Sequence, residues 1–294
     1  MKIVVAICTR NPRLDVLTEV LDSLRKQTET SFKTLLINNG GDELPLLRLK
    51  EKFAFDLLFE GRVGNSWARF TALSISEADL LVFVDDDNIL APNYIEAAAA
   101  LSIKNPTWGV FGGKQIRHQE LRVSKNKEFV LPYLAIRDLG STTLTQKAEL
   151  RWIPIEPVGA GMCITKEVIT TFLNSPNLDH YFLLGRKGKR LLSGEDSFIA
   201  RQATFTGLDY GYSPSLELIH RIKTDRLSVS YLAKLMFGYG LSDVNLERAL
   251  GLGENNFPRD IKTAILHFLF NFKKGKYGYL LGLRSLGQYW GNKK

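Results

Sequence analysis

Residues 81–92 read LVFVDDDNILAP, in which a short apolar run leads directly into three consecutive aspartates at positions 85 to 87. Two unit charges about 4 Å apart repel by roughly 4 kcal/mol at the effective dielectric of a protein surface. A buried strand that ends in three carboxylates therefore predicts that one carboxyl has a raised pKa or that a cation is bound there. The alternative is a solvated acidic turn, with Asn88 and Pro92 as its turn and helix-start residues.

The sequence around this stretch alternates between apolar strand patterns and helical patterns. Residues 3–8 (IVVAIC) form a continuous apolar run, which is typical of a strand buried on both faces. The predicted order is strand 3–8, helix 14–24, strand 33–38, an apolar segment at 55–60, helix 64–78, strand 80–84 and a helix that begins near Pro92. This alternation predicts an α/β fold with a mostly parallel central sheet flanked by helices.

Unusual polar side chains follow three of the predicted strands. The first strand leads into Thr9, Arg10 and Asn11, the second into Asn38 and Asn39, and the third into the aspartates. Because parallel strands end at the same edge of a sheet, these groups should meet in one ligand-binding cleft. Their placement favours a bound ligand over a solvated acidic turn.

The composition excludes several classes of protein. The chain of 294 residues suffices for one large α/β domain or two small ones. Its net charge of +8 is concentrated in residues 261–294, which hold seven Lys or Arg and no acidic residue. A basic charge confined to the tail argues against a nucleic-acid partner. No apolar run reaches the length of about 18 residues that a transmembrane helix needs. The two cysteines, Cys8 and Cys163, are expected to be buried free thiols in a reducing, cytoplasmic compartment.

Six motifs in a fixed order carry a resemblance to a known enzyme family. They are TRNPR, INNGGD, GRVGNSWARF, VFVDDDN, VGAGMCITKEV, and SGEDSFIARQ with a later histidine. Over residues 3–222 the chain resembles the family 2 glycosyltransferases, which implies the GT-A nucleotide-sugar fold. The implied organisation is a catalytic domain at 1–225, made of a nucleotide-sugar half (1–115) and an acceptor half (116–225), followed by a helical, basic C-terminal extension at 226–294.

The resemblance implies a divalent cation, Mn²⁺ or Mg²⁺, as cofactor. Such ions prefer carboxylate oxygens and keep positions open for the phosphate oxygens of a nucleotide-sugar. Asp85 and Asp87 match the acids of the family's DxD motif, so Asp87 should bind the metal, with Asp85 on the ribose or on the metal site. Asp86 lies in the same donor-binding loop and is the aspartate expected to be most solvated. His220 matches a histidine that completes the metal site in relatives, with a purely structural role as its alternative.

Further donor contacts follow from the same resemblance. Thr9, Arg10 and Asn11 match the loop that touches the nucleotide, although Thr and Asn also cap helices well. Asn38 stands where many relatives have an aspartate that accepts a hydrogen bond from uracil. Asparagine can accept or donate, so a UDP- or dTDP-sugar is favoured and guanosine stays open.

Two glycine-containing motifs imply contacts with donor and acceptor. In GNSWARF, Gly64 and Arg69 are expected near the diphosphate or behind the aspartate loop; the alternative is an ordinary helix with one exposed arginine. In the acceptor half, Trp152, Gly159 and Gly161 are expected to shape the acceptor pocket, because glycine lets the backbone approach a ligand and indole faces suit sugar rings.

The pair Glu195–Asp196 is the second acidic motif. In the family, the aspartate of this pair is the general base that deprotonates the acceptor hydroxyl while its oxygen attacks the anomeric carbon, which inverts the stereochemistry. The resemblance places that role on Asp196, with Glu195 in support. A plain helix cap is the alternative, since a helix N-terminus stabilises carboxylates.

The predicted function is an inverting, metal-dependent glycosyltransferase that moves a sugar from a UDP- or dTDP-sugar to a glycan or lipid-linked acceptor in bacterial surface polysaccharide synthesis. One alternative is a sugar nucleotidyltransferase, which would want a glycine-rich phosphate loop after the first strand, where this chain has TRNPRLD. The other is a sugar- or nucleotide-binding scaffold without catalysis.

The basic tail carries a prediction of its own. Its apolar residues Ile261, Ile265, Phe268, Leu269 and Phe272 fall on one helical face, Lys273, Lys274 and Lys276 follow, and Tyr277, Tyr279 and Trp290 add rings. This pattern predicts peripheral contact of residues 261–294 with an anionic membrane, on the inner face of the cytoplasmic membrane. The alternative is a helix that packs on the catalytic domain.

Overall fold

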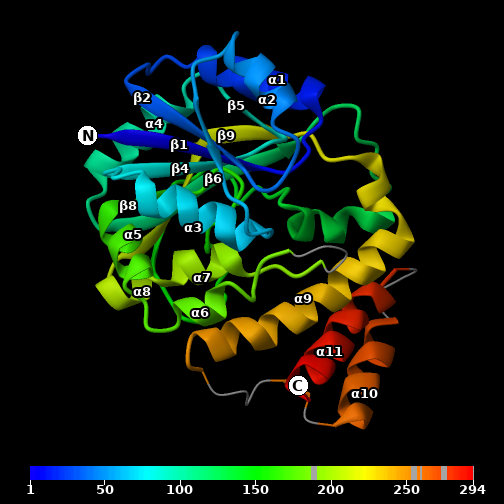
Figure 1. Cartoon of the computed structure of the whole chain (residues 1–294). Helices are drawn as coiled ribbons and strands as arrows, with labels where there is room; N and C mark the ends of the chain where they lie inside the picture. The colour runs from blue at the N-terminus through cyan, green and yellow to red at the C-terminus, as the bar shows by residue number, and fades with distance from the viewer. Residues whose placement is uncertain (187–190, 253–256, 259, 273–276, 294) are drawn as a thin grey trace.

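The structure is a computed structural model that describes residues 1–186, 191–252, 257–258, 260–272 and 277–293. The described strands form one mixed sheet with helices on both faces (Figure 1). In spatial order they are β3 (Asp56–Phe59), β2 (Phe32–Asn38), β1 (Ile3–Thr9), β4 (Leu80–Asp85), β8 (Cys163–Thr165), β6 (Trp108–Arg117), β9 (Asp209–His220) and β5 (Asn88–Leu90), with β7 (Leu144–Lys147) paired to β9.

The sheet is mostly parallel in direction, as predicted. β3, β2, β1 and β4 pair in parallel, and β6 and β9 run the same way after the antiparallel β8. The short strands β5 and β7 pair antiparallel with β9. As a result, the carboxyl ends of β1, β2 and β4 meet at one edge of the sheet, where the sequence places its unusual polar residues.

Helices cover both faces of this sheet. They are α1 (Leu14–Arg25), α2 (Leu44–Lys50), α3 (Asn65–Ile75), α4 (Tyr94–Lys104), α5 (Lys166–Leu173), α6 (Leu178–Tyr181), α7 (Glu195–Arg201) and α8 (Ala203–Thr206), with 3₁₀ segments η1 (Lys125–Leu134) and η2 (Thr224–Leu227). The helix predicted over 64–78 ends at Ile75, because Glu77 adopts a left-handed φ of 44° that a helix cannot continue through.

The core lies on both sides of the sheet. Alternate residues of β1 point to opposite faces: Val5 joins a cluster with α1 and α4, and Val4 joins one with α3, α5 and α7. The continuous apolar run at 3–8 is therefore explained by burial on both faces. Both cysteines are free thiols, as predicted, with Cys163 buried and Cys8 half-buried.

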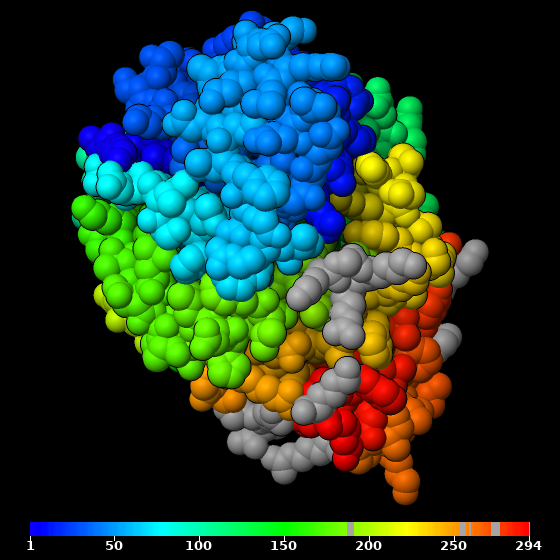
Figure 2. Space-filling view, viewed as in Figure 1, coloured from blue at the N-terminus to red at the C-terminus, as the bar shows by residue number. Residues whose placement is uncertain are grey.

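The described part of the C-terminal extension contains the helices α9 (Val229–Ala249), α10 (Ile261–Phe272) and α11 (Tyr279–Asn292). In Figures 1 and 2 the extension lies at one end of the molecule, coloured from yellow through orange to red. α9 shares an apolar cluster with η1, in which Leu232 and Leu235 pack near Val130 and Leu134. α11 lies very close to α9, since a Cβ atom on Gly240 would come within 2.0 Å of the carbonyl oxygen of Arg284. The extension is thus packed against the rest of the chain.

The predicted apolar face of the tail helix is divided in the structure. Phe268 faces α11, because a Cβ atom on Gly282 of that helix would lie 2.6 Å from the Cα atom of Phe268. Phe268 therefore does not share the exposed face. The large apolar side chains that α10 exposes are Ile261, Ile265, Leu266, Leu269 and Phe270. Lys273, Lys274, Lys276 and the side chain of Phe272 lie outside the described residues. No described helix is both long and apolar enough to span a membrane.

Candidate active site

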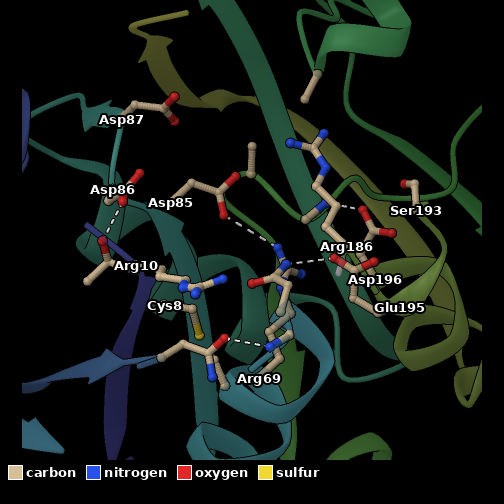
Figure 3. A pocket seen from close by; sticks show the side chains of 18 of the residues that line it. Cys8, Arg10, Arg69, Asp85, Asp86, Asp87, Arg186, Ser193, Glu195 and Asp196 are labelled. Carbon is tan, nitrogen blue, oxygen red and sulfur yellow. Dashed lines mark hydrogen bonds and ion pairs between the residues drawn. The ribbon is translucent and has the colours of Figure 1, made fainter. Parts of the chain in front are cut away.

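A cleft of about 380 Å³ opens at the edge of the sheet where β1 and β4 end. Its walls come from distant parts of the chain: the loops after β1, β2 and β4, the start of α3, η1, the segment before α7, the end of β9, η2, and α9. Figure 3 shows the side chains of Asp85, Arg69 and Asp196 directed into this space. The two acidic motifs of the sequence, more than a hundred residues apart, therefore face one cleft.

Asp86, the middle aspartate, is not simply solvated as expected. It is half-buried, and the hydroxyl of Thr9 at the end of β1 donates a hydrogen bond to its Oδ2. Burial raises the pKa of Asp86 to about 6, the Thr9 hydrogen bond opposes this rise, and the negative charges of Asp87 and Asp85 add to it. Of the three carboxyls, Asp86 is thus the one whose pKa is raised, as the sequence predicted for one of them.

Asp87 is paired with His220. The register of β5 and β9 sets Asn88 opposite His220, which brings Nε2 of His220 to 3.1 Å from Oδ1 of Asp87. The other ring nitrogen lies 3.2 Å from the carbonyl oxygen of Ala135. Burial would raise the pKa of Asp87, but the hydrogen bond and charge of His220, with Arg226 3.9 Å away, hold it at about 2.

This pair suits a divalent cation. Asp87 and His220, both almost fully buried, supply an oxygen and a nitrogen ligand side by side, and phosphate oxygens of a donor could complete the shell. The third predicted ligand, Asp85, is drawn instead toward Arg69, with Oδ1 3.4 Å from Nη2. Among the described residues, no group of three His, Cys, Asp or Glu is assembled around a single point.

Arg69 is buried, contrary to the alternative of an exposed arginine on a surface helix. Its exposed fraction is 3 %, and its guanidinium lies 4.8 Å from the ring centre of Phe83. Only Nη2 has a carboxylate partner, because Nε and Nη1 have no hydrogen-bond partner among the described residues. A buried cation with unused donors beside a cleft is prepared for an anionic ligand.

Glu195 and Asp196 begin α7, directly after Gly194, whose φ of 127° favours glycine. Glu195 is buried; one oxygen accepts a 2.7 Å hydrogen bond from Asn65, and burial together with the charge of Asp196 raises its pKa. Asp196 is half-buried and lines the cleft. Its Oδ1 accepts from Ser197 N in its own helix at 2.9 Å, and its Oδ2 accepts from Gly159 N at 3.0 Å. Asp196 therefore contacts the backbone of the first turn of α7 and also lines the cleft.

Of the other predicted donor residues, some line the cleft and some do not. Arg10 and Gly64 line it. Asn38 is fully buried. Its side-chain amide donates a hydrogen bond to the carbonyl oxygen of Gly41 and accepts one from Gly41 N, so the turn occupies the polar groups that were expected to contact a nucleobase. Asn11 is exposed, and its Oδ1 accepts from Asp42 N.

The predicted acceptor residues are also divided. Gly159 lines the cleft, and a Cβ atom there would meet Nη2 of Arg69 at 2.5 Å. Gly161 has a φ of 76°, and its carbonyl oxygen accepts from the hydroxyl of the buried Tyr94 at 2.7 Å, so its contacts are structural. Trp152 is 63 % exposed and does not line the cleft.

Several cleft residues carried no assignment from the sequence. They are Asn65, Tyr133, Arg186, Ser193, Arg226 and Tyr239, whereas Asn39, which the sequence places at the cleft, does line it. Asn65 directly follows Gly64 and could have been found from that motif. Tyr133 and Tyr239 belong to η1 and α9, which no motif marks, and only the tertiary packing brings them to the cleft.

Comparison with known families decides what this arrangement is. The family described as "Glycosyl transferase family 2" matches residues 4–166, more than half of the chain. The chain belongs to glycosyl transferase family 2. The predicted family is thereby confirmed, with the motif SGEDSFIARQ and His220 lying beyond the matched residues. The sheet with its flanking helices is the predicted GT-A fold.

Individual relatives are more distant. "Uncharacterized glycosyltransferase YwdF" of Bacillus subtilis (strain 168) is 29% identical over 101 residues, and the match spans 34% of this chain and 37% of that protein. S. aureus TarS 1-349 in complex with UDP-GlcNAc superposes with a TM-score of 0.55 at 15% identity, over 98% of this chain and 87% of the other. Mannosyltransferase PcManGT from Pyrobaculum calidifontis, in complex with GDP-Man and Mn²⁺, gives 0.59 at 14% identity, over 99% and 87%. At such identities the superpositions show the fold alone.

Proposed function

We propose that this protein is an inverting, metal-dependent glycosyltransferase that moves a sugar from a nucleotide diphosphate donor to an acceptor hydroxyl. The observation that carries the proposal is that Asp196 and the Asp87–His220 pair line one cleft in a family 2 fold. A base and a cation-binding pair in the same space are what a single displacement on a sugar diphosphate needs.

The donor would bind at the β1 and β4 ends of the cleft. Asp87 and His220 would hold Mn²⁺ or Mg²⁺, with Asp85 near it; the ion would neutralise the leaving diphosphate. Arg69, with two unused donor nitrogens, would bind the diphosphate or fix Asp85, and Thr9, Arg10, Asp86 and Gly64 would surround the nucleotide.

The nucleobase of the donor is indicated less directly than the contacts with its diphosphate. UDP- and dTDP-sugars stay our first choice because of the family resemblance, with guanosine as the alternative. The contacts of Asn38 do not add support for uracil, because its side-chain amide is occupied by Gly41. Asn39, which lines the cleft, holds the loop before α3 by donating to Arg62 O at 2.8 Å. Neither asparagine offers a free acceptor for uracil without rearrangement.

Asp196 would act on the acceptor. Its carboxylate would accept the hydroxyl proton as the acceptor oxygen bonds to the anomeric carbon, while the bond to the diphosphate breaks on the opposite face. Two backbone N–H groups orient this carboxylate, and the neighbouring Glu195 is held by Asn65. The nucleotidyltransferase alternative is disfavoured by the loop after β1, where Thr9, Arg10 and Asn11 stand in place of a glycine-rich phosphate loop.

A peripheral membrane role is a second component of the proposal. α10 exposes five large apolar side chains, and residues 261–294 contain no acidic residue to oppose an anionic surface. We therefore propose a catalytic unit at 1–225 and a membrane-facing extension at 226–294, with a lipid-linked or glycan acceptor of surface polysaccharide synthesis at the inner face of the cytoplasmic membrane.

The test is nucleotide binding followed by turnover. Melting temperature would be measured with UDP, dTDP, GDP, UDP-GlcNAc and GDP-Man, each with Mn²⁺, with Mg²⁺ and with chelator. A ligand that binds only the folded protein raises its stability, so at least one nucleotide should raise the melting temperature only with metal. Release of nucleotide from the sugar donors would then be followed. Absence of both a shift and release across this set would overturn the proposal.

A further inference from the structure

The segment before the candidate base is held by α9. The hydroxyl of Ser242 accepts a 2.8 Å hydrogen bond from Ser193 N, and a Cβ atom on Gly238 would come within 2.3 Å of the carbonyl oxygen of Leu191. Such close approach is possible only because residue 238 is glycine. α9 therefore fixes the chain directly before Glu195 and Asp196, although it belongs to the extension.

The same helix supplies an aromatic residue to the cleft. Tyr239 lines it together with Tyr133 of η1, Ser193 and Asp196. The two tyrosine rings meet edge to face, 5.4 Å apart at an angle of 67°, and the Tyr239 hydroxyl donates to the carbonyl oxygen of Tyr133 at 3.1 Å. Both residues are half-buried and contribute to the lining of the cleft.

An arginine of α11 holds this aromatic pair in place. Arg284 of α11 lies 5.9 Å from the ring centre of Tyr133 and forms a two-contact ion pair with Asp243 of α9, at 2.7 and 2.9 Å. Rigid aromatic faces bind the C–H face of a pyranose ring at little entropic cost, since few rotamers are lost. Trp152, the ring expected from the sequence, lies outside the cleft and does not provide this surface.

We infer that α9 forms one wall of the acceptor site, and that Tyr239 and Tyr133 are the surface on which the acceptor's sugar ring packs beside Asp196. This inference rests on the proposed function for the identity of its ligand. It makes the extension a part of the active site as well as a membrane-facing element.

The inference is tested by sugar binding to the full chain. The probes are the p-nitrophenyl glycosides of glucose, galactose, mannose and N-acetylglucosamine, titrated calorimetrically against protein saturated with UDP and Mn²⁺. Tyr239→Ala and Tyr133→Ala should each weaken binding of the best probe by about 2–10-fold, the usual worth of an aromatic contact. Tyr239→Phe, which keeps the ring, should weaken it less. Tyr289→Ala on α11, outside the cleft, is the matched control.

Turnover gives an independent readout. In Tyr239→Ala the KM for the best glycoside should rise by the same factor as its Kd, while Tyr289→Ala, outside the cleft, should keep the wild-type KM. Equal glycoside binding by wild type and Tyr239→Ala, or an equal loss in Tyr289→Ala, would overturn the inference. If no nucleotide sugar is turned over but Tyr239→Ala still loses glycoside binding, the sugar site stands and only the proposed transfer fails.

Discussion

The backbone N–H of Gly159 donates a hydrogen bond to Oδ2 of Asp196 over 3.0 Å, which joins the glycine loop of the acceptor half to the candidate base. The other carboxylate oxygen accepts from Ser197 N at 2.9 Å. The side chain is thus oriented by two backbone donors, one on each oxygen. This double contact makes the effect of losing its negative charge predictable.

Asp196→Asn should lower the rate of sugar transfer by about 10²–10⁴-fold, the usual worth of a general base, while UDP affinity is unchanged. Asparagine keeps the shape but presents one NH₂ group to a backbone donor, so the melting temperature should fall slightly. Transfer rate, UDP binding and melting temperature would be compared with those of Asp209→Asn, an aspartate outside the cleft. Transfer above about a tenth of wild type would show that another group is the base.

Asp87→Ala should abolish the dependence of UDP binding on Mn²⁺ and abolish turnover, because the variant removes the oxygen ligand beside His220. It should also lower the stability of the metal-free protein by about 1–3 kcal/mol, since a buried hydrogen bond to a charged group is lost. Urea unfolding and UDP titrations with Mn²⁺ and with chelator measure both effects. Asp86→Asn, which can retain the hydrogen bond from Thr9, is the control for stability. Full Mn²⁺-dependent binding in Asp87→Ala would refute the metal assignment.

Glu60 should make stability depend on acidic pH. It accepts hydrogen bonds from the side chain of Arg62 at 2.7 and 2.8 Å and from Thr71 at 2.6 Å, and the contacts with Arg62 lower its pKa from 4.5 to about 2 despite burial. A carboxyl whose pKa is lower in the folded than in the unfolded protein adds stability at any pH above its unfolded-state pKa. That stability is lost as the pH falls through the folded-state pKa.

Glu60→Gln should therefore be less stable than wild type at pH 7, and the difference should shrink as pH falls from 4.5 toward 2. Urea unfolding at several pH values measures this difference. Glu77→Gln, at an 84% exposed side chain paired with Lys2, should differ little from wild type at any pH. A difference for Glu60→Gln that is independent of pH would contradict the assigned cause.

The exposed face of α10 should bind anionic vesicles. Replacing Leu266 and Phe270, 64% and 62% exposed, with glutamate removes apolar area and adds negative charge, so sedimentation with phosphatidylglycerol-containing vesicles should be lost. Wild-type binding should weaken as salt rises. Ile103→Glu, at a 73% exposed apolar residue on α4, is the matched control. Equal sedimentation of the double variant and wild type would exclude this face.

Much of the donor side of the site could be predicted from the sequence, because its residues lie next to strand ends. A continuous apolar run followed by polar residues encodes both the strand and the edge where it stops. Thr9, Asp85 and Asp87 were placed at the cleft for this reason, and the motif order pointed to Asp196 and His220. Local order along the chain is sufficient when the group that binds follows directly on the element that positions it.

The tertiary structure decided what local order does not encode. The sequence places Asn38 and Asn39 together at the cleft, yet only Asn39 lines it, because the packing of the turn pairs the side-chain amide of Asn38 with Gly41. The long-range pairing of β5 with β9 brings His220 to Asp87, and the packing of α9 on η1 brings Tyr239 to Tyr133. Exposure is set the same way: Arg69 became buried and Trp152 exposed because burial depends on which surfaces meet, and that depends on the whole fold.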